Sequence, residues 1–114
     1  MVSTMEITYA NSRIRKICTD DKTAKKELGG NAKFLRERLD DMLLVENLEE
    51  LRSFPGNYHE LTGNRKGQIA CSITGRIRLI FAPDHEPIPT KPDGGLDWSK
   101  VTAVVNLEIG DYHK

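Results

Sequence analysis

The pattern of apolar residues changes near Pro55 and Gly56, and this change limits the possible fold more than any other feature of the sequence. Before it, apolar residues recur every three or four positions, which is typical of helices that bury one face. After it, apolar and polar residues alternate, which is typical of strands with one buried face. Helices in one half and strands in the other predict the α+β class, with helices packed on one face of a mainly antiparallel sheet.

The first half of the chain predicts a short strand followed by two helices. β-Branched and aromatic side chains predict a strand over residues 5–9. Residues 11–12 supply side-chain oxygens that can cap the first helix, and two glycines at 29–30 end it. Within this helix, a Thr and two Asp residues at 19–21 form a second signal for a helix start. Asn31 opens the second and clearest helix, whose predicted apolar face consists of Leu35, Leu39, Met42 and Leu43.

The second half predicts four strands, which gives a sheet of four to five strands in all. Thr74 and Gly75 form a turn signal between two alternating segments, and this predicts a β-hairpin. Because side chains alternate across a strand, Arg76 and Arg78 are expected on the face opposite the apolar side chains. A loop rich in Pro and Gly spans residues 83–98. The expected strands cover residues 58–61, 68–74, 76–81 and 100–109, the last with Val101, Ala103, Val105, Leu107 and Ile109 on one face.

The length of 114 residues fits one domain, spanning residues 1–114. The net charge is zero, but opposite charges occupy different segments: residues 1–36 carry +4 and residues 37–64 carry −5. Residues 65–81 contain four basic residues and no acidic one, whereas residues 82–114 carry −3. A neutral protein of this kind can present a cationic face that attracts phosphates, although mixed charge is also common on ordinary soluble surfaces.

Several features of other protein classes are absent from the sequence. No apolar run approaches the ~20 residues of a membrane helix, and residues 1–8 lack the basic head and apolar stretch of a secretory signal. Cys18 and Cys71 are not spaced like metal ligands or a redox pair, and we expect both to be buried. The sequence therefore predicts a cytoplasmic protein that does not span a membrane, and none of its motifs indicates a bound metal or cofactor.

Four cations close to the predicted hairpin are candidates for binding phosphate. Arg65 and Lys66 precede the hairpin, and Arg76 and Arg78 belong to its second strand. Arginines on an exposed strand often serve only solubility, but four cations without an acid between them suit a phosphodiester. From these residues alone, phosphate or nucleic-acid binding ranks only slightly above a generic binding module.

Two positions offer histidines for acid–base chemistry. His59 lies in a short strand, where a structural hydrogen bond is the commonest role of a His. Asp111, Tyr112 and His113 follow directly on the last strand, and a His beside a carboxylate and a phenol suits proton transfer near neutral pH. The competing interpretation of these last residues is a frayed terminus.

Three segments of the second half, taken together, resemble one known family. Residues 54–67 contain the sequence HELTG, residues 72–81 contain GRIRLIF, and residues 107–113 end in DYH. In this combination the chain resembles the HigB-type toxins of the RelE/ParE superfamily, often labelled plasmid-maintenance killer proteins. The resemblance covers nearly the whole chain and implies a compact RelE-like α+β domain.

The resemblance also implies an activity. Toxins of this kind belong to type II toxin–antitoxin systems and are ribosome-dependent, metal-independent endoribonucleases that cut mRNA and so inhibit translation. A cognate antitoxin with a helix-turn-helix domain neutralises them, so the implied partners are this antitoxin, the ribosome and mRNA. The residues that match the active-site positions of the family are His59, Arg78, Asp111, Tyr112 and His113.

The implied reaction is attack of an RNA 2′-hydroxyl on the adjacent phosphate, which yields a cyclic phosphate and a free 5′-hydroxyl. Arg78 is expected to balance the phosphorane charge. His113 or His59 is expected to transfer protons, with Asp111 orienting His113 or acting as the base. Tyr112 is expected to stack on a base or to orient the phosphate.

One position departs from the pattern of the family. Related toxins commonly have Lys where this chain has Thr62, which removes a cation near the expected phosphate. Arg65 or Lys66 can replace this charge only if one of them reaches the same point. The departure keeps an alternative open: a non-catalytic or inactivated RelE/ParE-like module that acts by binding an antitoxin or another protein.

Overall fold

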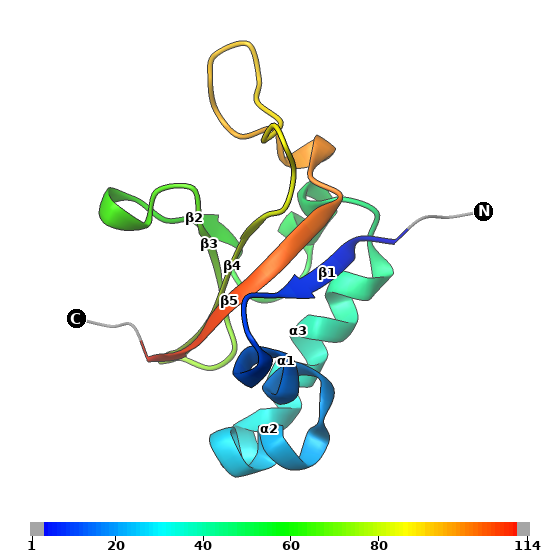
Figure 1. Ribbon diagram of the computed structural model, residues 1–114, viewed down its shortest axis with the longest axis vertical. Helices are drawn as coiled ribbons and strands as arrows, with labels where there is room; N and C mark the ends of the chain where they lie inside the picture. The colour runs from blue at the N-terminus through cyan, green and yellow to red at the C-terminus, as the bar shows by residue number, and fades with distance from the viewer. Residues whose placement is uncertain (1–3, 112–114) are drawn as a thin grey trace.

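The computed structural model describes residues 4–111, which form a single five-stranded sheet with helices packed on one side (Figure 1). The strand order is β1-β5-β4-β3-β2. β1 is parallel to β5, and all other neighbours are antiparallel. The predicted α+β class with a mainly antiparallel sheet is therefore confirmed. The strands are β1 (Glu6–Tyr9), β2 (His59–Glu60), β3 (Ile69–Ser72), β4 (Ile77–Pro83) and β5 (Ala103–Asp111).

Three α-helices, rather than two, precede the hairpin. The first expected helix divides into α1 (Ser12–Thr19) and α2 (Asp21–Leu28), because Asp20 between them has an extended backbone, with φ −121° and ψ 112°. The Asp20 carboxylate accepts hydrogen bonds from the backbone N–H and the hydroxyl of Thr23 and so caps α2. The third helix, α3 (Ala32–Leu44), is the one predicted from Asn31 onward. Short 3₁₀ turns complete the chain: η1 (Gly29–Asn31), η2 (Leu48–Ser53), η3 (Gly63–Arg65) and η4 (Trp98–Lys100).

The core lies between the helices and one face of the sheet. On α3 the side chains of Leu35, Leu39 and Met42 are buried as predicted, but Leu43 is 49% exposed and lies at the margin of the apolar stripe. On the sheet, Cys71, Leu79 and Ile109 form one row across β3, β4 and β5, and all three are buried. We call the helix-covered side of the sheet the inner face.

The buried face of β5 differs from the prediction because the pairing with β4 contains a bulge. Ile80 lies opposite Glu108, whereas Phe81 lies opposite Asn106, so Leu107 is an extra residue. The extra residue shifts the alternation by one position. Val104 and Asn106 are therefore fully buried instead of Ala103, Val105 and Leu107. Val101, which precedes the strand, and Ile109, which follows the bulge, are buried as predicted.

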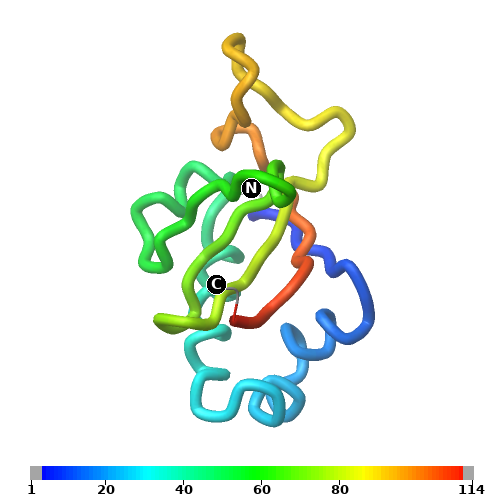
Figure 2. The backbone as a smooth tube through the Cα atoms, turned by 90° about the vertical axis from the view of Figure 1, so that its left-hand side faces the viewer, coloured from blue at the N-terminus to red at the C-terminus, as the bar shows by residue number. Residues whose placement is uncertain are grey.

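The long connection between β4 and β5 projects beyond one end of the sheet, as Figure 2 also shows. It is an ordered loop in which Thr90 and Leu96 form an antiparallel bridge. At its base, the Trp98 Nε1–H donates to the Glu60 carboxylate at 2.9 Å, and the Arg52 guanidinium stacks on the indole ring at 3.8 Å from its centre. Within residues 4–111, no helix is long and apolar enough to cross a membrane.

Candidate functional site

The strand pairing gathers several predicted residues on the side of the sheet away from the helices. His59, Ala70, Ile80 and Glu108 lie opposite one another on β2, β3, β4 and β5 and therefore share a face. A second row on this face contains Ser72, Arg78 and Gly110. We call this side, with these two rows of residues, the outer face.

Arg78 lies where strand alternation predicts it. Its neighbours Ile77 and Leu79 belong to the inner face, and Arg78 is half-buried between Ser72 and Gly110 on the outer face. The centre of a three-strand segment is a rigid place for a side chain, because its backbone is paired on both sides. The side chain of Arg78 is therefore suited to presenting a fixed positive charge.

A tight turn before β2 positions His59. Gly56 and Asn57 both have positive φ, of 128° and 51°, and a Cβ on Gly56 would come within 3.0 Å of the side chains of Arg38 and Tyr58. After this turn, the Nδ1–H of His59 donates to the carbonyl oxygen of Asn57 at 2.8 Å. With Nδ1 serving as donor, Nε2 is the ring nitrogen that can exchange a proton.

Arg65 crosses the outer face and contacts a residue that the sequence did not single out. Its guanidinium donates to both carboxylate oxygens of Glu108, at 2.8 and 3.3 Å, and to the side-chain oxygen of Gln68 at 2.9 Å. From η3, the side chain has to pass over β3 and β4 to reach β5, and in that row Ala70 and Ile80 are 0% and 1% exposed. The sequence contains one sign of this role: Glu108 is a charged residue between the apolar residues Leu107 and Ile109 of a predicted strand.

The other two predicted cations lie in turns outside the strands. Arg76 precedes β4 in the turn, so strand alternation does not fix its direction. Its side chain is 79% exposed and forms an ion pair with Asp111 at 3.1 Å. Lys66 follows η3 and is exposed, as is Thr62 just before it.

Two predicted site residues, Tyr112 and His113, lie outside the described residues. The structure therefore places His59, Arg65, Arg78 and Glu108 on the outer face. Asp111 at the end of β5 lies opposite Ile77, so the register does not place it in the rows of the outer face. Among residues 4–111, no group of three or more His, Cys, Asp or Glu side chains is arranged to hold a metal ion.

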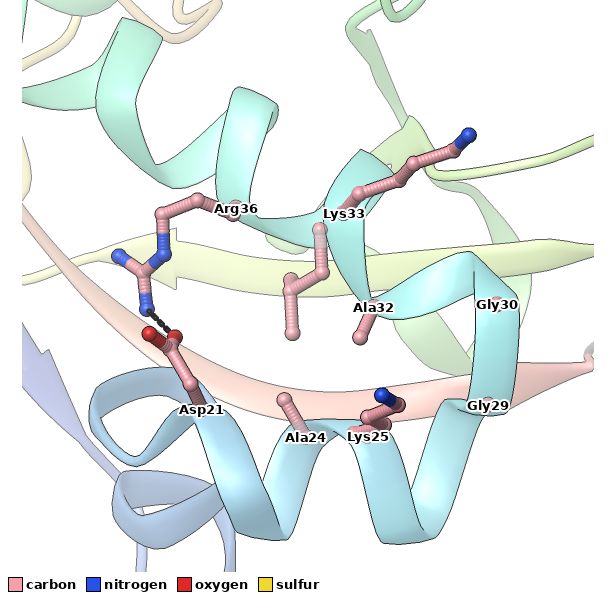
Figure 3. A pocket seen from close by; sticks show the side chains of 9 residues that line it. Asp21, Ala24, Lys25, Gly29, Gly30, Ala32, Lys33 and Arg36 are labelled. Atoms are coloured by element: carbon pink, nitrogen blue, oxygen red, sulfur yellow. Dashed lines mark ion pairs between the residues drawn. The ribbon is translucent and has the colours of Figure 1, made fainter.

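A separate groove of about 380 Å³ lies between α2 and α3, away from the predicted site residues (Figure 3). Its floor is apolar and includes Ala24, Ala32 and Leu35. Lys25 and Lys33 lie at its rim, as does Arg36, which pairs with Asp21 at 3.6 Å. Such a groove fits an apolar side chain flanked by acidic groups better than it fits an isolated ion.

Comparison with solved structures relates this fold to known proteins. A YoeB/ParE toxin from Agrobacterium tumefaciens matches with a TM-score of 0.51 and 12% identity, over 96% of this chain and 100% of that chain. A YoeB dimer from Staphylococcus aureus matches with a TM-score of 0.55 and 17% identity, over 98% and 100%. No protein-family model matches the sequence, and no curated protein shows significant similarity to it. The chain therefore has the α+β fold of these toxins, while its assignment to the HigB type stays a prediction.

Proposed function

We propose that this protein is the toxin of a type II toxin–antitoxin system and cuts mRNA on the ribosome. The observation that carries the proposal is the outer face, where the pairing of β2, β3 and β4 brings His59 and Arg78 to the same side of the sheet. The fold shared with YoeB and YoeB/ParE toxins over nearly the whole chain supports it, and so does the resemblance of the sequence to HigB-type toxins.

The substrate supplies the nucleophile, so the protein needs only to position the RNA and move protons. Attack of the 2′-hydroxyl on the adjacent phosphorus breaks the bond to the 5′ oxygen and leaves a cyclic phosphate and a 5′-hydroxyl. Arg78 balances the negative charge of the phosphorane. His59, held through Nδ1 by the Asn57 carbonyl, transfers a proton through Nε2. His59 on β2 and Arg78 on β4 are separated by β3, so they start about 10 Å apart across the sheet, and the long Arg78 side chain has to extend toward β2 for both to act on one nucleotide.

The end of β5 supplies the remaining groups in this proposal. Asp111 orients His113 or takes the 2′ proton itself, and His113 shares proton transfer with His59. Tyr112 stacks on a base or orients the scissile phosphate. The partners in the cytoplasm are the ribosome with its mRNA, and an antitoxin with a helix-turn-helix domain that neutralises the toxin.

Induced expression in a bacterium tests the proposal. We expect growth arrest together with codon-phased cuts in an abundant mRNA, mapped by primer extension. Arg78→Ala should reduce ribosome-programmed cleavage by roughly a hundredfold, because it removes a donor to the charge of the transition state. Arg15→Ala on α1 is the matched control, since Arg15 is exposed on a helix that packs against the other side of the sheet.

The thermal melt of each variant separates loss of activity from loss of folding. Arg78→Ala should retain a cooperative melt close to that of the parent, while Arg15→Ala should match the parent in both measurements. Normal cleavage by Arg78→Ala would remove this residue from the mechanism. A parent that neither arrests growth nor cuts mRNA would contradict the proposed function.

The groove between α2 and α3 favours a second candidate, a non-catalytic module that acts by binding a protein. Its apolar floor and cationic rim suit an acidic segment of an antitoxin or another target (Figure 3). The same expression experiment distinguishes the two functions, because growth arrest without mRNA cuts would favour this second candidate.

A further inference from the structure

Arg65 on the outer face and Arg76 in the turn before β4 are both paired with carboxylates of the same strand, β5. Arg65 pairs with Glu108 at 2.8 Å, and Arg76 pairs with Asp111 at 3.1 Å. The absence of acidic residues from segment 65–81 therefore does not leave these cations uncompensated. The compensation comes from β5, which follows both arginines in sequence and which Arg65 reaches only across β3 and β4.

The pairing of Arg65 with Glu108 is built into the fold. Backbone hydrogen bonds from Arg65 to Thr62 and from Gln68 to Arg65 close the turn that carries the arginine. Gln68, just before β3, and Glu108 on β5 then hold the guanidinium together, with both Glu108 oxygens engaged. The side chains of Arg65 and Glu108 are 33% and 40% exposed, so a ligand on the outer face can reach the pair.

We propose that Glu108 limits the affinity of the outer face for free RNA by occupying Arg65. This inference rests on the proposed function, because it concerns the same RNA-binding face. A carboxylate and a phosphodiester bind guanidinium through the same two-pronged geometry, so they compete for it. An RNA phosphate therefore has to displace an internal carboxylate before it gains this contact, and Glu108 acts as a specificity-determining residue against unstructured single strands.

Equilibrium binding of an uncleavable RNA tests this role. The probe is a fluorescein-labelled single strand with a 2′-O-methyl group at every position, which lacks the attacking hydroxyl. Its affinity is measured by anisotropy over a range of salt concentrations. Glu108→Gln keeps the size of the side chain and removes its charge, and Glu108→Ser is a second variant with the same expected direction of change.

The expected gain follows from one additional phosphate contact. For single strands, each neutralised phosphate contributes about 0.7 to the slope of log affinity against log salt, so Glu108→Gln should steepen the slope by about 0.7. At 50 mM salt this corresponds to roughly eightfold tighter binding than that of the parent. The double variant R65Q/E108Q should bind within about twofold of the parent, because in the parent Arg65 is already occupied.

A matched control separates the local pair from the overall charge. Glu49→Gln also removes a carboxylate paired with an arginine, Arg52 at 2.9 Å, but in η2. We expect Glu49→Gln to bind the probe like the parent. Equal gains in Glu49→Gln and Glu108→Gln would show an effect of net charge alone and would overturn the inference.

Two further outcomes bear on the inference. No gain in the folded Glu108→Gln and Glu108→Ser variants would overturn it, and so would a double variant that binds clearly more weakly than the parent. Ribosome-programmed cleavage by the parent protein is measured separately. If the parent cuts mRNA while Glu108→Gln shows no gain, this inference fails and the proposed function stands; if the parent does not cut, the function fails whatever the binding shows.

Discussion

At the scale of single residues, burial determines the chemistry of the two cysteines. Cys18 is 2% exposed and Cys71 is 0% exposed. Burial raises the pKa of the Cys18 thiol to about 11 and that of the Cys71 thiol to about 12. Hydrogen bonds and nearby arginines lower both pKa values, but the effect of burial is larger. Both groups are therefore thiols rather than thiolates at neutral pH, and they pack as small apolar side chains.

These raised pKa values predict a loss of stability at high pH. The unfolded chain releases both thiol protons near pH 9, whereas the folded chain retains them to about pH 11 and 12. The contribution is fully present below pH 9 and is lost as the pH rises through the folded values. Urea unfolding from about pH 7.5 to 10.5 should show this decline, and a C18A/C71A variant should show less of it. The same decline in the variant would contradict the assignment.

The residues that the sequence located correctly depend on local rules, and the one that it missed depends on a distant partner. Strand alternation was enough to place Arg78, and apolar spacing was enough to bury Cys71. Glu108 escaped notice because its partner Arg65 is 43 positions away. No periodicity links two such residues, and only the strand order brings them together.

At the scale of elements, His85 has a structural role that the sequence did not indicate. It belongs to the Pro- and Gly-rich loop that the sequence predicts over residues 83–98. In the structure, its Nε2 accepts hydrogen bonds from the backbone N–H groups of Thr102 and Ala103, at 3.1 and 3.3 Å. The imidazole therefore joins the beginning of the long loop to the beginning of β5.

His85→Ala should lower the free energy of unfolding by about 1 kcal/mol, because two backbone donors lose their side-chain acceptor and water replaces it only in part. Urea unfolding measures the change. Glu86→Ala, at the exposed neighbouring position, is the control and should stay within about 0.5 kcal/mol of the parent. An unchanged stability of His85→Ala would mean that the long loop is held by its other hydrogen bonds alone.

The elements whose ends were predicted well have explicit end signals, and those predicted less well do not. Asn11 caps α1 by accepting from the N–H of Ile14 at 2.9 Å, and the two glycines after α2 end it, as expected. The bulge at Leu107 carries no such signal, because it is a property of the pairing between β4 and β5. Alternation in one strand cannot reveal where its partner loses register.

At the scale of the whole molecule, the fold class was predictable and the strand order was not. Helical spacing followed by alternation indicates an α+β domain wherever it occurs. The parallel pairing of β1 with β5 joins Ile7 to Val104, from opposite ends of the chain. Every exposed strand edge offers the same backbone N–H and C=O groups, so the apolar pattern does not determine which two strands become neighbours.

The core connects both ends of the molecule, and this predicts one cooperative unfolding transition. The cluster of buried side chains extends without a break from Ile14 and Ile17 on α1 to Trp98 on η4, which lies at the end of the sheet away from α2 (Figure 1). Trp98 is the single tryptophan and is 3% exposed, so its fluorescence reports on that end. Far-ultraviolet circular dichroism reports mainly on α1, α2 and α3. In a domain of this size the two signals should give the same urea midpoint.

A conservative change on α1 makes this comparison decisive. Ile17 is 1% exposed, and Ile17→Val should cost about 0.5–1.5 kcal/mol by removing one buried methyl group. If the molecule unfolds as one unit, the fluorescence of Trp98 should shift to lower urea by the same amount as the circular dichroism, although the two residues lie in different elements. If the circular dichroism shifts and the fluorescence does not, α1 and its neighbours unfold separately, and the outer face can remain formed without them.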